Sequence, residues 1–111
     1  MELGQFSVSL AVKDMQKSKA FYEALGFAIC EGCGSIEENW LILQKGAVVI
    51  GLFKDMFERN ILTFNPDNAR AIEEGMIEAG YPPVTKTNGT EGPCHCVFTD
   101  PDGNQIMFDQ F

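Results

Sequence analysis

Basic residues, histidine, tryptophan and long apolar runs are all scarce in this chain. Only eight Lys and Arg stand against 16 Asp and Glu, which gives a net charge of −8. Such a charge repels the phosphate backbone, so we expect no nucleic-acid partner. The longest apolar run, residues 47–53, is far too short to cross a bilayer, and the N-terminus lacks a basic-then-apolar signal. We therefore expect a cytoplasmic protein with no membrane partner.

The four cysteines form two close pairs, Cys30 with Cys33 and Cys94 with Cys96. Without a secretion signal, they argue against a disulfide framework. Side chains alternate along a strand, so Cys30 and Cys33 should point to opposite faces unless the glycines around them make a turn. A zinc site stays open in that case, although the ligand spacing is poor for one. The alternative is that the cysteines are small buried hydrophobic residues.

The order of the expected elements repeats once along the chain. The first half predicts a strand at 6–12, a helix between Asp14 and Gly26, and strands at 27–33, 40–44 and 47–53. The second half predicts a strand at 60–65, a helix between Asn68 and Gly80, a strand at 81–88 and a closing hairpin of 94–99 and 104–111. The hairpin turn is Asp100-Pro101-Asp102-Gly103, in which Asp bonds the turn backbone and Pro presets φ. The pattern indicates an α+β fold, a single domain over residues 1–111, with one βαβββ module at about 1–56 and another at about 57–111.

Two segments of the sequence resemble a known family. Val8 to Phe27 looks like the opening strand and helix of the glyoxalase/bleomycin-resistance/dioxygenase family, the vicinal-oxygen-chelate superfamily, and Phe98 to Asp109 looks like its last hairpin. The resemblance implies an open eight-stranded mixed-sheet barrel with a cleft on its concave face, and commonly a homodimer.

The resemblance also implies where metal ligands would stand, and this chain lacks them there. The four matched positions are Ser7, Gly51, Ile61 and Met107. Divalent metals need several carboxylate or imidazole donors, and only the Ser7 hydroxyl is even a weak one. A shifted register would bring Gln5, Thr63 and Asp109 to the site, still a poor set of donors. We therefore expect no metal and no other cofactor.

Strand alternation predicts the side chains that line the cleft. In the first module these are Ser7, Ser9, Trp40, Ile42, Val49, Gly51 and Phe53. In the second they are Ile61, Thr63, Gln105, Met107 and Asp109, joined by Cys94, Cys96 and Phe98 if the closing turn has four residues. We expect Gly51 beside Trp40 to leave room for a flat ligand, and Asp109 and Glu38 near the mouth to favour a cationic group. The alternative is that these side chains simply fill the barrel.

Three function classes follow. The preferred one is a metal-free protein that binds an apolar or aromatic small molecule, with a cationic ligand as one option, similar to the drug-sequestering bleomycin-resistance branch. The second is a glyoxalase-like lyase or isomerase, either with misassigned metal positions or with metal-free acid–base chemistry by Asp109, His95 or Cys96. His95 is expected opposite Phe108, facing the second helix, which favours a structural role over that of a base. The third is a dimeric interaction or regulatory module.

Overall fold

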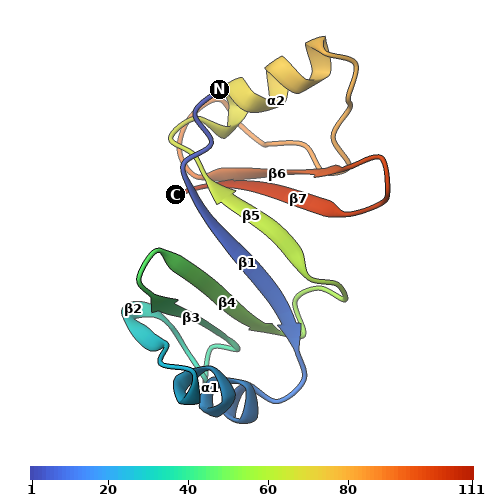
Figure 1. Ribbon diagram of the computed structural model, residues 1–111. Coiled ribbons are helices and arrows are strands. Elements are labelled where there is room, and N and C mark those ends of the chain that lie inside the picture. Colours follow the sequence, from blue (N-terminus) through green and yellow to red (C-terminus); the bar gives the residue numbers. More distant parts are fainter. The chain divides into compact units, whose positions relative to one another are not determined.

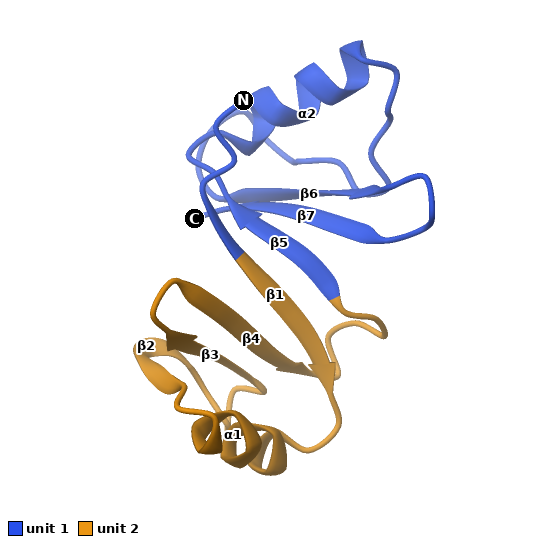
Figure 2. Ribbon diagram, viewed as in Figure 1, with its two compact units in different colours: residues 1–6, 61–111 blue, residues 7–60 orange.

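The computed structural model describes residues 1–111, which form two helices and seven strands (Figure 1). They divide into two compact units (Figure 2): unit 1 holds residues 1–6 and 61–111, and unit 2 holds residues 7–60. Neither helix has the length and apolar character that a membrane span requires. The predicted α+β class is confirmed.

Unit 2 places one helix against a four-stranded layer. Its elements are β1 (Gln5–Val12, whose first two residues belong to unit 1), α1 (Met15–Ala24), β2 (Ala28–Ser35), β3 (Trp40–Lys45) and β4 (Val48–Lys54). The strand order is β2-β3-β4-β1, with β1 parallel to β4 and the other pairs antiparallel. Asp14 caps α1 by accepting the amide of Lys17 at 3.0 Å. The core between helix and strands contains Met15 and the fully buried Leu43 and Leu52.

Unit 1 is built in a similar way with fewer strands. Its elements are β5 (Ile61–Asn65), α2 (Ala69–Glu78), β6 (Cys94–Thr99) and β7 (Gln105–Gln110), with strand order β5-β7-β6. The Asn68 side chain caps α2 by accepting the amide of Ala71 at 3.0 Å. The core under α2 contains Ile72, Cys96, Phe98 and Phe108.

Seven strands are observed where the resemblance implied eight. The segment expected as a strand at 81–88 contributes only an isolated bridge, in which Thr85 pairs with Val97 of β6. Two reasons are visible in this segment. Pro82 and Pro83 have no amide hydrogen to donate. Thr87 bonds the Glu73 carboxylate of α2 through both its amide and its hydroxyl, at 2.8 and 2.7 Å.

The closing hairpin forms where expected, but its register is shifted by one residue. Asp100 accepts the amides of Asp102 and Asn104 at 2.9 and 2.8 Å, as the turn chemistry predicted. However, Thr99 pairs with Gln105, so the loop runs from Asp100 to Asn104 and has five residues instead of four. A slip of one residue moves every side chain of a strand to the other face. The expected pairing of His95 with Phe108 is therefore wrong.

Cys30 and Cys33 are not the separate, buried small residues that one alternative expected. The two residues are joined by a disulfide, and neither is fully buried. Gly32 and Gly34 adopt positive φ values of 78° and 87°, and β2 bulges between Ile29 and Gly34. The glycines thus supply the turn that strict alternation would not give. Cys94 and Cys96, in contrast, are free and buried, as small hydrophobic residues should be.

Candidate functional site

The face of unit 2 that points away from α1 carries a row of aromatic side chains. Trp40 pairs with Phe53 across β3 and β4, and their rings stack with centroids 6.4 Å apart and planes 11° from parallel. Phe57, in the loop after β4, continues the row with its ring 5.3 Å from that of Phe53. Trp40, Phe53 and Phe57 are each partly exposed, so the row offers apolar surface that the core does not use.

The other predicted residues of the first module lie on the same face. Strand pairing places Ile42 opposite Gly51, Val49 opposite Gln44 and Ser9 opposite Gly51, and alternation adds Ser7. Ser7 and Ser9 are buried, whereas Ile42 and Val49 are partly exposed. Alternation along the strands therefore predicted correctly which of these residues share one face. Their role in binding stays a prediction.

The expected space above Gly51 is absent. A Cβ built on Gly51 would lie 2.5 Å from Cε2 of Phe53 and 3.1 Å from Cδ1 of Ile42, and Trp40 stands opposite Phe53, not beside Gly51. The Phe53 ring leans across the glycine and fills the gap there. Any flat ligand must therefore contact the outer surface of the aromatic row instead of a slot above Gly51.

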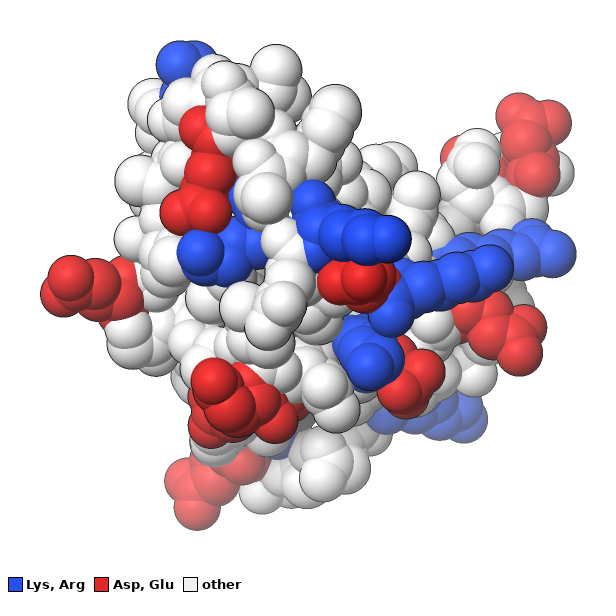
Figure 3. Space-filling model, turned by 90° about the horizontal axis from the view of Figure 1, so that it is seen from below, with Lys and Arg blue, Asp and Glu red and all other residues white.

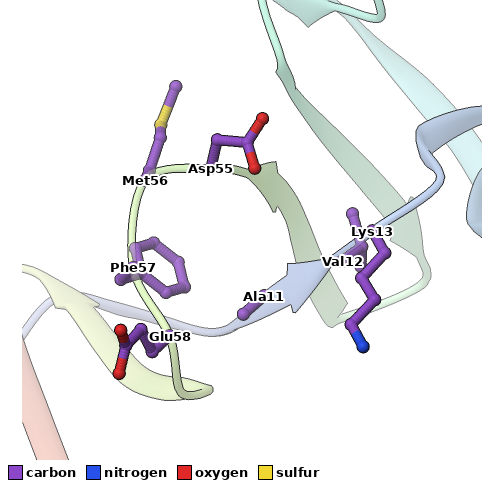
Figure 4. Close-up of a pocket in the computed structure, with 7 residues that line it drawn as sticks. All are labelled: Ala11, Val12, Lys13, Asp55, Met56, Phe57 and Glu58. Atoms are coloured by element: carbon purple, nitrogen blue, oxygen red, sulfur yellow. The ribbon is translucent and has the colours of Figure 1, made fainter.

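A pocket of about 510 Å³ adjoins the end of this row (Figure 4). Its lining is Ala11, Val12, Lys13, Asp55, Met56, Phe57 and Glu58. The Asn60 side chain accepts the amide of Ala11 at 3.0 Å, which ties the base of the loop to β1. Ala11 in turn pairs with Phe53, so the pocket and the aromatic row are neighbours within one unit.

The sequence did not predict this pocket, because residues 55–59 lie between the expected strands at 47–53 and 60–65 and none of them was a candidate site residue. One signal was present: Met56 and Phe57 are apolar residues in an otherwise charged loop, and Met56 remains 51% exposed. Lys13, Asp55 and Glu58 add charges of both signs to the pocket lining. Such a lining combines apolar surface with groups that can orient a polar substituent.

The corresponding face of unit 1 brings together His95 and Asp109, which stand directly opposite each other on β6 and β7. Burial raises the pKa of the Asp109 carboxyl above its ordinary value, and the charge of His95 partly opposes this. Asn65 fixes the strand locally by donating its side-chain amide to the carbonyl oxygen of Asp109 at 3.0 Å. An imidazole beside a carboxyl of raised pKa can pass protons, which makes the pair the strongest acid–base candidate in the chain.

The shifted hairpin also moves Cys94, Cys96 and Phe98 out of the predicted site. They lie on the α2 side of the sheet, packed with Phe108 in the core of unit 1. Burial raises the pKa of the Cys96 thiol to about 12, so it is protonated and inert near neutral pH. The structure therefore places Cys96 in the core of unit 1, away from the face on which it was predicted.

The remaining residues predicted for the second module fall on the His95 face. Thr63 pairs with Met107 across β5 and β7, and alternation places Ile61, Gln105 and Asp109 with them. Ile61 and Thr63 are buried, and Met107 is partly exposed. Glu38, expected near the mouth, lies exposed in the turn after β2, where its carboxylate accepts the Ser35 hydroxyl at 3.2 Å.

The donor chemistry does not fit the metal that the family implies. Unit 2 contributes a serine and a glycine at the matched positions, Ser7 and Gly51, and unit 1 contributes Ile61 and Met107. Nowhere do three His, Cys, Asp or Glu side chains come together as a metal site requires.

Charge is unevenly divided between the units. Unit 2 holds six of the eight basic residues, and unit 1 holds nine of the 16 acidic ones. On the face drawn in Figure 3, Lys and Arg side chains lie among Asp and Glu, so that no single sign covers it. The face drawn therefore has no continuous basic surface.

Comparison with known proteins identifies the family. Residues 4–108 match the model of the Glyoxalase/Bleomycin resistance protein/Dioxygenase superfamily, and the chain belongs to that superfamily. The resemblance stated from the sequence is confirmed. No match is found among curated proteins.

Solved structures share the fold at low sequence identity. A superfamily member from Vibrio splendidus 12B01 has a TM-score of 0.74 at 15% identity, covering 96% of this chain and 98% of its own. A Legionella pneumophila structure described as NAD-dependent benzaldehyde dehydrogenase has a TM-score of 0.78 at 18% identity, with the same two coverages of 96% and 98%. Methylmalonyl-CoA epimerase from Mycobacterium tuberculosis has a TM-score of 0.68 at 13% identity, covering 98% and 87%. At such identities these structures inform the fold alone.

Proposed function

We propose that this protein binds a small molecule with a planar, apolar part on the aromatic row of unit 2, without a metal ion. The observation that carries the proposal is the partly exposed stack of Trp40 on Phe53, continued by Phe57 into the adjoining pocket. Aromatic surface of this kind binds flat ligands by burial and stacking. Lys13, Asp55 and Glu58 in the pocket then orient a polar or cationic substituent.

Fluorescence of Trp40, the chain's one tryptophan, tests this directly. Titration with a panel of planar neutral and planar cationic compounds should change its emission, and the same compounds should raise the melting temperature. The variant Phe53→Leu keeps the fluorophore and removes the stack. A ligand ring stacked on Phe53 is worth about 0.5–1.5 kcal/mol, and leucine cannot supply this stack. The affinity for the ligand should therefore fall roughly 2- to 10-fold.

Phe21→Leu is the matched control, because Phe21 is an aromatic residue of α1 that is 61% exposed. It should leave the affinity unchanged. A panel that shifts neither emission nor melting temperature contradicts the proposal, as does an equal loss in both variants. Elemental analysis showing one nickel, zinc, iron or manganese per chain would contradict its metal-free part.

A second candidate, a metal-free lyase or isomerase, is favoured by the pairing of His95 with Asp109. Removal of a proton from carbon beside a carbonyl is the step that such a pair can perform. Proton NMR would follow deuterium exchange at that carbon in small 2-oxo compounds and acyl thioesters. Catalysis predicts exchange that is lost in both His95→Gln and Asp109→Asn, whereas no exchange with any compound supports binding alone.

The homodimer and the cytoplasmic location expected from the sequence remain proposals. Light scattering over a range of concentrations tests the first, and a protein that stays monomeric at the highest concentration would contradict it. Cell fractionation tests the second.

A further inference from the structure

The disulfide between Cys30 and Cys33 occupies an accessible position in the fold. It lies on β2, the edge strand of the order β2-β3-β4-β1, so no further strand covers its outer side. Glu31 and Gly32, between the two cysteines, are exposed, and both cysteines are partly exposed. A disulfide in such a place can be attacked by a thiolate from solution, which a buried one cannot.

The disulfide closes an excursion of the chain. Ile29 pairs with Leu43 and Gly34 pairs with Leu41, so four residues of β2 stand opposite the single residue Ile42 of β3. The positive φ of Gly32 allows the backbone to fold back far enough for the cysteines to meet, with Cα atoms 5.5 Å apart. Opening the disulfide frees this bulge to rearrange, since the covalent link across it is lost.

The bulge is in contact with the aromatic row. Gly34, directly after Cys33, lies so close to Trp40 that an added Cβ would come within 2.7 Å of Cδ2 and 2.8 Å of Cε3 of the indole ring. Ser35 is the strand partner of Trp40, and Trp40 stacks on Phe53. A change in the bulge therefore reaches the indole ring through a single intervening residue.

We propose that Cys30 and Cys33 form a thiol–disulfide exchange site, reduced by a dithiol, whose redox state alters the surroundings of Trp40. In the first step a thiolate of the dithiol attacks one cysteine sulfur, the bond between Cys30 and Cys33 breaks, and the released thiolate takes up a proton. The second thiol then attacks the mixed disulfide and releases the other cysteine as a thiol. Two electrons and two protons reach the protein, and the dithiol becomes a disulfide.

The reductant is a dithiol because the site disfavours a monothiol. After a monothiol attacks, the freed cysteine stands next to the mixed disulfide, only three residues away along the chain. It therefore expels the monothiol and restores the original disulfide. A dithiol avoids this reversal through its own second sulfur. Cys94 and Cys96 take no part, because both are buried under α2 in the other unit.

Maleimide labelling of the folded wild-type protein, followed by intact mass, tests the chemistry. Protein treated with oxidised glutathione should take up no label, and after dithiothreitol it should take up two, both mapped to Cys30 and Cys33. Cys94 and Cys96 should react only after unfolding in guanidinium. At equal thiol concentration, 2-mercaptoethanol should expose fewer sites than dithiothreitol. The proposal is overturned if both cysteines are labelled after the oxidising treatment, or if dithiothreitol exposes neither.

Trp40 emission tests the coupling in the same samples, with no ligand present. Reduction should shift the emission, reoxidation should reverse the shift, and Cys30→Ser/Cys33→Ser should show no response to dithiothreitol. Cys94→Ser is the matched control and should respond as the wild type does. If Cys94→Ser does not fold, the reversibility of the wild-type emission shift still tests the coupling. An emission that stays constant while labelling rises from none to two overturns the coupling.

Discussion

Replacing Arg70 should loosen the loop at residues 88–92 and lower the stability of unit 1. Arg70 lies in the first turn of α2, and its guanidinium donates one hydrogen bond to each of four backbone carbonyl oxygens at 2.7 to 3.2 Å, those of Asn88, Gly89, Glu91 and Gly92. The substitution Arg70→Ala removes all four bonds, and the segment then depends on its remaining contacts.

The magnitude follows from the exposure of these bonds. A protein hydrogen bond contributes a net 0.5–1.5 kcal/mol or so, and bonds on an exposed loop lie near the lower limit of about 0.5. Four such bonds give about 2 kcal/mol as an upper figure, because a released loop regains conformational entropy. We expect the free energy of unfolding to fall by about 1–2 kcal/mol. Arg70→Lys should lower the free energy of unfolding by nearly as much, since an ammonium group cannot reach four carbonyls at once.

Urea unfolding measures the stability, and hydrogen exchange of a peptide covering residues 86–93 measures the loop. Arg59→Ala is the control for charge, since it removes an exposed arginine from unit 2. We expect faster exchange in this peptide for Arg70→Ala and no change for Arg59→Ala. A stability within about 0.3 kcal/mol of the wild type, with unchanged exchange, would refute the argument that the guanidinium holds the loop.

Three further changes test other parts of the structure. Leu52→Ala removes a fully buried side chain of the unit 2 core and should cost about 2–4 kcal/mol in urea unfolding, whereas Val48→Ala, at a site 56% exposed on the same strand, should cost under about 0.5. Asp109 has a raised pKa in the folded protein, so its favourable contribution is present below its ordinary value of 3.8 and is lost as pH rises through the folded pKa. As pH rises through that window, the wild type should therefore lose stability relative to Asp109→Asn. Stability profiles of the two proteins that run parallel with pH would contradict this. Gly51→Ala should push the Phe53 ring off Trp40 and so change the fluorescence emission of Trp40. An unchanged emission spectrum would show that the Phe53 ring does not lean on Gly51.

Local chemistry made much of the fold predictable. Asp14 and Asn68 cap the two helices, and Asp100 organises the last turn, because each role depends only on a short side chain and the next few amides. Alternation along β3 and β4 likewise placed Trp40 and Phe53 on one face, and the turn that joins these strands lies at Gly46 and Ala47. These inferences use neighbours in sequence or one short hairpin, where few alternatives compete.

The candidate residues of unit 1 could not be predicted as safely. A five-residue loop instead of a four-residue one exchanges the faces of β6, so that Cys96 leaves the site and His95 enters it. A signal was available in the sequence, since Cys94, Cys96 and Phe98 form the more apolar face of β6, as Ile106 and Phe108 do on β7. The two apolar faces must meet the same helix.

By itself, the sequence determined the family, the class of fold and the elements with strong local signals, because caps, turns and alternation act over a few residues. Tertiary structure decided which face of β6 is buried, where Cys30 meets Cys33, and how the loop after β4 encloses a pocket. The buried face of β6 and the pocket depend on partners far away in the chain, and the bulge that joins Cys30 to Cys33 depends on how β2 pairs with β3. The physical reason is that burial under α2 and pairing with β3 or β7 outweigh the small local preferences that separate one register from the next.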